Sequence, residues 1–228
     1  RDMKFDASKF QWLGSIAPRP AVLSVWHTAP VSDLASAQAK ESIMGSTGLG
    51  SETYLAPTLM NHIAGTKFKI VKGYKGGAKI NKAMEGSEVH GRMNYWSGWT
   101  AAKAAWLAEG KLKHIVSYGG DIKELPNLPK MIDLAKTAEQ KAMVRFLEVA
   151  PRVGMGFWVS PEVPKARAVA LRTAFQAMLR DPAFVADAAK RKAPVSPVSG
   201  EKLDEIVAAV YKTPPATIAK LKQVFGFK

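Results

Sequence analysis

The segment Ser42-Ile43-Met44-Gly45-Ser46-Thr47-Gly48-Leu49-Gly50-Ser51 carries the fold class that the sequence predicts. Its first three residues suit a short strand, its glycines suit a loop, and Ser51 is a good N-cap for a helix that ends at Gly65. The same order of strand, loop and helix recurs along the chain. Strands are predicted at residues 42–44, 68–71, 89–94 and 114–118. This alternation favours an α/β fold with a largely parallel sheet.

The glycine loop, residues 45–51, is the clearest candidate for a binding site. Because it follows a strand and opens a helix, its backbone N–H groups and the positive helix end converge on one point. Gly48 and Gly50 either leave room for an anion or take a positive φ, while Ser46, Thr47 and Ser51 supply hydroxyl donors. The spacing fits neither a P-loop nor a dinucleotide-binding fingerprint. A glycine-rich turn without a ligand explains the spacing alone equally well.

The chain of 228 residues is strongly basic: 33 Lys and Arg against 19 Asp and Glu give a net charge of +14. A surplus of this size favours an anionic partner. A lysine-rich stretch without acidic residues follows the glycine loop; its members are Lys67, Lys69, Lys72, Lys75, Lys79 and Lys82. It predicts a positive region beside the loop, although such lysines are more often simply solvated surface. No nucleic-acid recognition motif accompanies the charge, which disfavours a nucleic-acid-binding domain.

A search for catalytic and metal-binding patterns finds little. The chain has no cysteine, which excludes disulfides, thiolate metal sites and cysteine nucleophiles. His27, His62, His90 and His114 have no metal-ligand spacing, and each is expected to be structural. No serine has the nucleophile-elbow spacing, and no close pair of carboxylates stands at a strand end. We therefore expect no enzyme, no cofactor and no metal site. No apolar stretch approaches the ~18 residues of a membrane helix.

The two ends of the chain differ from this alternating part. Residues 9–30 are predicted to form two short strands punctuated by prolines. Beyond Pro129 the pattern is mainly helical, with a lone strand at 157–159. Proline after an N-cap residue predicts helix starts at Asp181-Pro182 and Thr213-Pro214. Such a segment cannot easily build its own two-layer core, so it either lies against the first part or lacks the strands that belong with it.

Several short motifs then occur in the order in which one protein family carries them. The family patterns are S-A-G-x-G-[ST]-x-x-H, Y-K-G, G-x-V-D, F-D-N, L-P-x-[LV]-P and x-P-x-x-[VI]-P. The similar segments here are residues 46–54, 74–76, 87–90, 93–95, 125–129 and 157–164. With these motifs the chain resembles the periplasmic substrate-binding proteins of tripartite tricarboxylate transporters, the Bug or TctC-like family. The match follows nearly the whole chain, which makes it more specific than one glycine loop.

The resemblance implies an α/β fold of two domains, a periplasmic-binding-protein-like clamshell of type II, which holds a carboxylate between the domains. It implies that residues 1–30 are interdomain crossover strands, 31–142 are domain two, and 143–228 are the C-terminal part of domain one. Family members begin with a signal peptide and the first part of domain one. Nothing similar precedes Arg1, so the resemblance implies that domain one is incomplete in this chain.

The resemblance also implies a set of ligand-binding residues. They are Ser46, Thr47, Gly48, Gly50, Ser51, Tyr74, Asn94 and Trp96. Asn94 stands where the family has an acidic residue, which puts selection for a ligand amine in doubt. Two further family positions also differ: the histidine is Tyr54, and the aspartate after valine is His90.

The function implied by the resemblance is that of a periplasmic receptor that delivers a small organic carboxylate to the membrane subunits of a transporter. It needs no cofactor, no nucleic-acid partner and no insertion into the membrane. From the residues alone, an α/β enzyme or sensor that binds a phosphorylated ligand at the glycine loop is the alternative.

Overall fold

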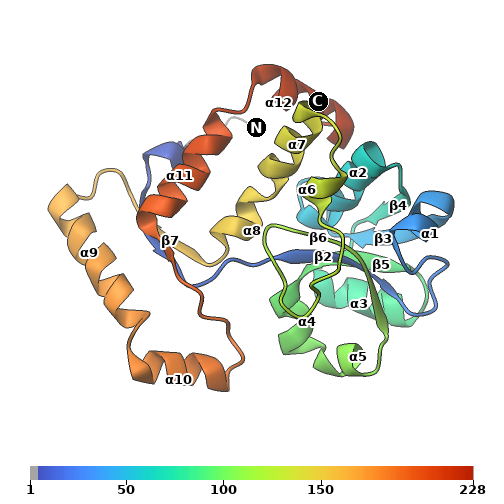
Figure 1. The fold of residues 1–228 in the computed structure, drawn as a ribbon, viewed down its shortest axis with the longest axis horizontal. Helices are drawn as coiled ribbons and strands as arrows, with labels where there is room; N and C mark the ends of the chain where they lie inside the picture. The colour runs from blue at the N-terminus through green and yellow to red at the C-terminus, as the bar shows by residue number, and fades with distance from the viewer. Residues whose placement is uncertain (1–4, 228) are drawn as a thin grey trace. The chain divides into compact units, whose positions relative to one another are not determined.

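The chain folds into two compact units in the computed structural model, which describes residues 5–227 (Figure 1). Unit 1 consists of the chain up to Arg19 together with Val149–Thr213. Unit 2 consists of Pro20–Glu148 together with the chain from Pro214 onward. This division differs from the predicted segments 1–30, 31–142 and 143–228, chiefly in where it places the second strand and the last helix.

Unit 2 contains a five-stranded sheet in the order β4-β3-β5-β2-β6. The strands are β2 Ala21–Trp26, β3 Glu41–Ser46, β4 Lys67–Lys72, β5 Gly91–Tyr95 and β6 Leu112–Tyr118. Strand β3 is parallel to β4 and β5, whereas β2 lies antiparallel between β5 and β6. The predicted alternation is therefore confirmed, with β2 as the exception. Strand β2 precedes the alternating part and enters the sheet at the edge where β5 and β6 end, since Ala21 pairs with Tyr95 and Tyr118.

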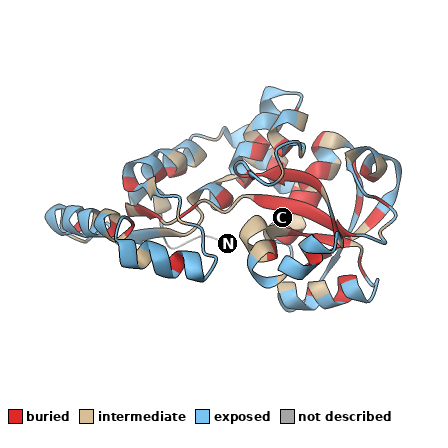
Figure 2. Cartoon of the chain, turned by 60° about the horizontal axis from the view of Figure 1, so that its bottom comes forward, coloured by how far each residue is buried: buried red, intermediate tan, exposed pale blue. Residues whose placement is uncertain are grey.

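Helices cover both faces of this sheet. The first face carries α1 Leu34–Ala39, α2 Glu52–Ala64, α6 Met131–Leu134, α7 Ala138–Leu147 and α12 Pro215–Phe225. The second face carries α3 Gly77–Glu85, α4 Trp96–Ala102 and α5 Ala104–Ala108. All residues of β2 are buried as a result, with Leu23 in the first core and Val22 in the second. Figure 2 shows buried strands between helices whose outer surfaces are exposed.

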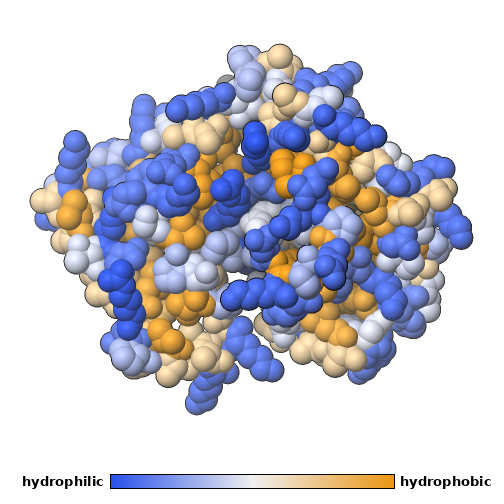
Figure 3. Space-filling view, in the orientation of Figure 1, coloured by the Kyte–Doolittle hydropathy of each residue, from blue (hydrophilic) through white to orange (hydrophobic). Residues whose placement is uncertain are grey.

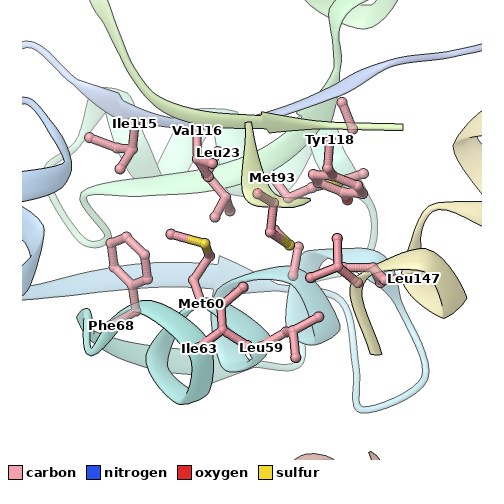
Figure 4. Close-up of a cluster of buried hydrophobic side chains, with 14 of the residues drawn as sticks. Leu23, Leu59, Met60, Ile63, Phe68, Met93, Ile115, Val116, Tyr118 and Leu147 are labelled. Atoms are coloured by element: carbon pink, nitrogen blue, oxygen red, sulfur yellow. The ribbon is translucent and has the colours of Figure 1, made fainter. Parts of the chain in front are cut away.

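The first core explains why the last helix belongs to unit 2. Figure 4 shows Leu59 and Met60 of α2 beneath Leu23 and Met93 of the sheet, and the same core includes Leu221 and Phe225 of α12. Full burial of an apolar side chain of this size contributes about 1.5–3 kcal/mol. Helix α12 packs on α2 and α7 for this reason, although it follows the helices of unit 1 in the sequence.

Unit 1 is built on a three-stranded sheet in the order β7-β1-β8. Its elements are η1 Ala7–Lys9, β1 Gln11–Ser15, α8 Val149–Val153, β7 Gly156–Val159, α9 Lys165–Met178, α10 Pro182–Lys190, β8 Val198–Ser199 and α11 Gly200–Tyr211. The strand predicted at 157–159 is thus present but not alone, because β1 pairs with it antiparallel. Leu203 and Val207 of α11 pack on Trp12 of β1, and Arg172 of α9 donates to the Trp12 carbonyl oxygen at 2.9 and 2.6 Å.

Local sequence signals set the ends of several elements. The Asp181 carboxylate accepts from the N–H groups of Ala183 and Phe184, so the predicted N-cap is confirmed. The helix predicted to begin at Pro214 begins at Pro215 instead. Helix α1 was not predicted, although Asp33 caps it with a complete capping box. The third strand of the alternating part begins at Gly91 rather than at residue 89.

The surface agrees with the spread of charge along the sequence. Figure 3 shows hydrophilic side chains distributed over the visible face with apolar groups between them. Among the described residues, no helix combines the length and the apolar character needed to cross a membrane.

Candidate functional site

The topology of unit 2 singles out one place for a ligand. Strand β3 continues into α2 on the first face of the sheet, and its parallel neighbour β5 continues into α4 on the second face. After the carboxyl ends of β3 and β5, the chain therefore turns to opposite faces of the sheet. Open α/β sheets bind ligands outside the carboxyl ends of their strands at such a switch point. The predicted ligand residues stand after β3, after β4 and at the end of β5, all at this edge.

The glycine loop after β3 is held together by hydroxyl groups around Thr53. The Thr53 hydroxyl oxygen accepts from the backbone N–H of Thr47 at 3.1 Å. It lies 2.6 Å from the Ser51 hydroxyl, 3.2 Å from that of Ser46 and 3.4 Å from that of Thr47. The Gly48 carbonyl accepts from the Ser51 hydroxyl at 2.9 Å. Thr53 was not among the predicted site residues, although a threonine in the first turn after a glycine loop is a visible signal.

The network changes the roles predicted for two kinds of residue. Ser51 stands at the N-cap of α2 but makes no capping bond with its side chain, because its hydroxyl donates within the loop. Gly48 and Gly50 have no positive φ, so of the two reasons expected for glycine here the backbone one is wrong and room for an anion remains. A Cβ atom added at either glycine would meet no atom within 4 Å. Both glycines thus border open space.

The loop leaves donors for an anion. Within residues 5–227, no hydrogen bond is made by the backbone N–H groups of Leu49, Gly50 and Thr53. They cluster at the first turn of α2, where the helix dipole adds a partial positive charge. Glu52 lies in the same turn, and the Tyr118 hydroxyl donates to its carboxylate at 3.3 Å. Burial, followed by the nearby Glu52 charge, raises the pKa of Tyr118 well above its usual value.

The segment after β4 is tied directly to the glycine loop. The Ser46 carbonyl oxygen accepts from the N–H groups of Gly73 and Tyr74 at 3.1 and 3.2 Å. The Tyr74 hydroxyl donates to Glu88 at 2.5 Å. Burial, with a smaller contribution from Glu88, raises the pKa of Tyr74 to about 12. Tyr74 is therefore neutral at physiological pH and is joined to the predicted loop through the backbone.

The remaining predicted residues stand at the end of β5. The Asn94 side-chain oxygen accepts from Arg92 at 3.1 Å. The Trp96 ring packs edge-on against His114 with 5.4 Å between ring centroids, and its indole N–H is buried without an acceptor. Neither side chain is hydrogen-bonded to the glycine loop. The structure thus gathers Ser46, Thr47, Gly48, Gly50, Ser51 and Tyr74 into one connected group. It places Asn94 near the end of the neighbouring strand β5 and Trp96 at the start of α4.

The predicted lysine-rich stretch is exposed along β4 and α3. The side chains of Lys72, Lys75 and Lys79 are all exposed, and Lys72 lies 5.6 Å from the centre of the Tyr54 ring. None of the lysines of the stretch takes part in the ion pairs found among the described residues. Their charge is therefore not neutralised by neighbours and adds to the positive field beside the loop.

Two of the four histidines, His90 and His114, fit structural roles. His114 lies 2.9 Å from the Ser24 hydroxyl, and burial, with help from Lys113, lowers its pKa to about 4. His90 accepts from the Ile43 N–H at 2.9 Å, and burial lowers its pKa. His27 and His62 are exposed. Among residues 5–227 no group of three or more acidic, histidine or cysteine side chains is arranged to hold a metal ion.

No protein-family model and no curated protein sequence matches this chain. Solved structures do. A TctC solute-binding protein from Polaromonas, without ligand, has a TM-score of 0.66 at 17% identity, over 98% of this chain and 72% of that one. Rpa4515 from R. palustris with adipate has a TM-score of 0.64 at 20% identity, over 99% and 72%. MatC (Rpa3494) from Rhodopseudomonas palustris with bound malate has a TM-score of 0.61 at 15% identity, over 99% and 73%.

This likeness settles the fold. The chain has the α/β fold of TctC-type periplasmic binding proteins, which confirms the predicted α/β fold class. The matched proteins are solute-binding proteins, and two of them hold adipate or malate.

Proposed function

We propose that this chain is a solute receptor that binds a small organic carboxylate at the carboxyl ends of β3, β4 and β5. The observation that carries the proposal is the glycine loop at the switch point, where the N–H groups of Leu49, Gly50 and Thr53 have no acceptor within the described part of the chain. A carboxylate satisfies such donors and the positive helix end together. The adipate and malate held by structures of the same fold support this ligand class.

The predicted residues take distinct roles in this proposal. The loop from Ser46 to Ser51 binds one carboxylate chiefly through its backbone N–H donors, while the Ser46 and Ser51 hydroxyls hold the loop in shape. Tyr74, Asn94 and Trp96 line the neighbouring wall, where the aromatic rings pack along the ligand and Asn94 contacts it with its carboxamide. The exposed lysines speed the approach of an anion without touching it when bound.

The wider setting is also a proposal. The likeness to periplasmic binding proteins supports a receptor in the periplasm that passes its ligand to a tripartite tricarboxylate-type membrane transporter. It supports unit 2 as domain two of that fold and unit 1 as belonging to domain one. A receptor of this kind releases its ligand unchanged, so we propose no catalytic activity.

The test is calorimetric titration of the 228-residue chain with mono-, di- and aromatic carboxylic acids, and with inorganic phosphate as a separate arm. The informative variant is Gly48→Val. Its Cβ enters open space and the backbone φ is not positive, so the variant folds but places a side chain beside the loop donors. Gly86→Val is the control, because Gly86 ends α3 at the opposite edge of the sheet and its Cβ also has room.

A carboxylate that binds the parent and Gly86→Val, but not Gly48→Val, supports the proposal. Binding that Gly48→Val leaves unchanged shows that the loop is only a turn. A chain that takes phosphate and no carboxylate instead has the alternative function of a phosphate-binding enzyme or sensor.

A further inference from the structure

A buried cation lies next to the proposed binding wall. Arg92 is on β5, exposes 8% of its surface and faces the second core. Burial lowers the pKa of its guanidinium to about 10, so the group is still charged at neutral pH. No carboxylate of the described residues neutralises it. Its partners are neutral oxygens: the Met93 carbonyl at 2.9 Å and the side chains of Asn81 and Asn94, both at 3.1 Å.

Two further contacts hold the guanidinium in this position. It lies 5.5 Å from the centre of the Trp99 ring, within range of a cation–π interaction. It also fills the space beside Gly77, the first residue of α3, where an added Cβ would collide with it. The orientation of Arg92 is therefore set by packing from two helices and by three acceptors.

The charge of Arg92 decides which way the Asn94 carboxamide points. A guanidinium has only donors, so the oxygen of Asn94 must face it, since the amide NH₂ would place donor against donor. The Asn94 Nδ2 then points away from Arg92. Nδ2 has no acceptor among residues 5–227 and is not one of the buried unsatisfied nitrogens, so it retains contact with solvent. Gly98 of α4 makes room for the carboxamide, because a Cβ there would lie 2.9 Å from both Nδ2 and Oδ1 of Asn94.

From this geometry we propose that Arg92 is a positioning residue that makes Asn94 a hydrogen-bond donor toward the ligand, so that the site selects a dicarboxylate and rejects an ω-amino acid. The inference rests on the proposed carboxylate-binding function. The glycine loop takes one carboxylate, and the second carboxylate accepts from Asn94 Nδ2. An ammonium group in its place would face a donor and the field of a buried cation, which disfavours it.

The test uses two matched ligand sets in calorimetric titrations: succinate, butyrate and 4-aminobutyrate, and adipate, hexanoate and 6-aminohexanoate. For the set whose length fits, the parent chain should bind the dicarboxylate at least about tenfold more tightly than the amino acid. Arg92→Met frees the carboxamide to turn and should reduce this ratio about tenfold, while the monocarboxylate binds as before. A purely structural role of Arg92 would leave the ratio of the two affinities, for dicarboxylate and for amino acid, unchanged.

Two aspartate variants keep the test decisive if Arg92→Met does not fold. Asn94→Asp replaces the donor by an acceptor and should shift the preference toward the amino acid. Asn81→Asp is the matched comparison, since Asn81 accepts from the same guanidinium at the same distance but lies on α3. It weakens the field of the buried cation and keeps the Asn94 donor, so its preference for the dicarboxylate should fall less than that of Asn94→Asp.

The outcomes separate the two proposals. An unchanged ratio in folded Arg92→Met or in Asn94→Asp overturns the inference, as does a parent that binds mono- and dicarboxylate equally, while the carboxylate receptor stands. A parent that binds no carboxylate in either set refutes the receptor function itself.

Discussion

Thr53→Val tests whether one hydroxyl organises the glycine loop. Valine keeps the shape of threonine but removes the oxygen that accepts from the Thr47 N–H at 3.1 Å and contacts the Ser51 hydroxyl at 2.6 Å. A hydrogen bond of this kind contributes about 0.5–1.5 kcal/mol, and a buried donor left without an acceptor costs about 1–3 kcal/mol. Because Thr47 is only half-buried, water can reach its N–H, so we expect a loss of about 1–2 kcal/mol.

The effect on binding should exceed the effect on stability. The variant loses the bonds that tie Thr47 and the Ser46 and Ser51 hydroxyls to the first turn of α2, so a carboxylate must order the loop as it binds. We expect the affinity, measured by calorimetry, to fall at least tenfold. The urea midpoint should fall by the loss of about 1–2 kcal/mol divided by the slope of the urea titration.

Thr58→Val is the matched control on the same helix. The Thr58 hydroxyl donates only to the Tyr54 carbonyl, four residues earlier in α2, at 2.7 Å. Its removal should leave affinity and stability nearly unchanged. If Thr53→Val unfolds at the parent's urea concentration and binds with the parent's affinity, the hydroxyl network is incidental to the loop.

His114 has a pKa of about 4 in the folded chain against 6.5 in the unfolded chain, so below pH 6.5 the unfolded chain binds the proton first and stability falls. Between pH 7 and pH 5, urea titrations should show a loss of about 2 kcal/mol in the parent that His114→Gln lacks. Equal losses in both proteins would contradict the lowered pKa of His114. The rate of ligand association, measured by stopped flow, should fall as the salt concentration rises, and it should be lower in Lys75→Glu than in the parent. Lys40→Glu, at the amino end of β3, is the control and should keep the parent's rate. A rate that responds neither to salt nor to Lys75→Glu would leave these lysines without a role in binding. Gly45→Ala should cost about 1–3 kcal/mol, because the new methyl group would lie 2.5 Å from a methyl of the stiff Ile80 side chain; an unchanged melting temperature would show that α3 yields freely.

The sequence was sufficient for the features that local chemistry controls. Strand, glycine loop and helix at residues 42–65 could be located because β-strand residues, glycines and an N-cap serine follow one another there. The pattern of Ala21–Trp26 likewise shows a strand. It does not show direction, because the antiparallel placement of β2 depends on the edge at which the chain enters the sheet.

Other features depend on contacts that are distant in sequence. The apolar face of α12 predicts a packed helix but not which core receives it. Strand β8 has two residues, too few for any pattern. Thr53 and Arg92 matter through the side chains that meet them, and neither Thr47 nor Asn81 is marked in the sequence as their partner.

The order in which the chain visits the two units bears on how the protein folds during synthesis. Residues 20–148 leave the ribosome as one stretch that holds all five strands of the larger sheet. Their core nevertheless lacks Leu221 and Phe225 until the whole of α9, α10 and α11 has also been made. The nascent chain therefore holds an unfinished core, with an uncovered apolar surface on α2 and α7, for the several seconds that about 65 residues take at ~5–20 residues per second. Helix α12 is therefore the last element that completes this core.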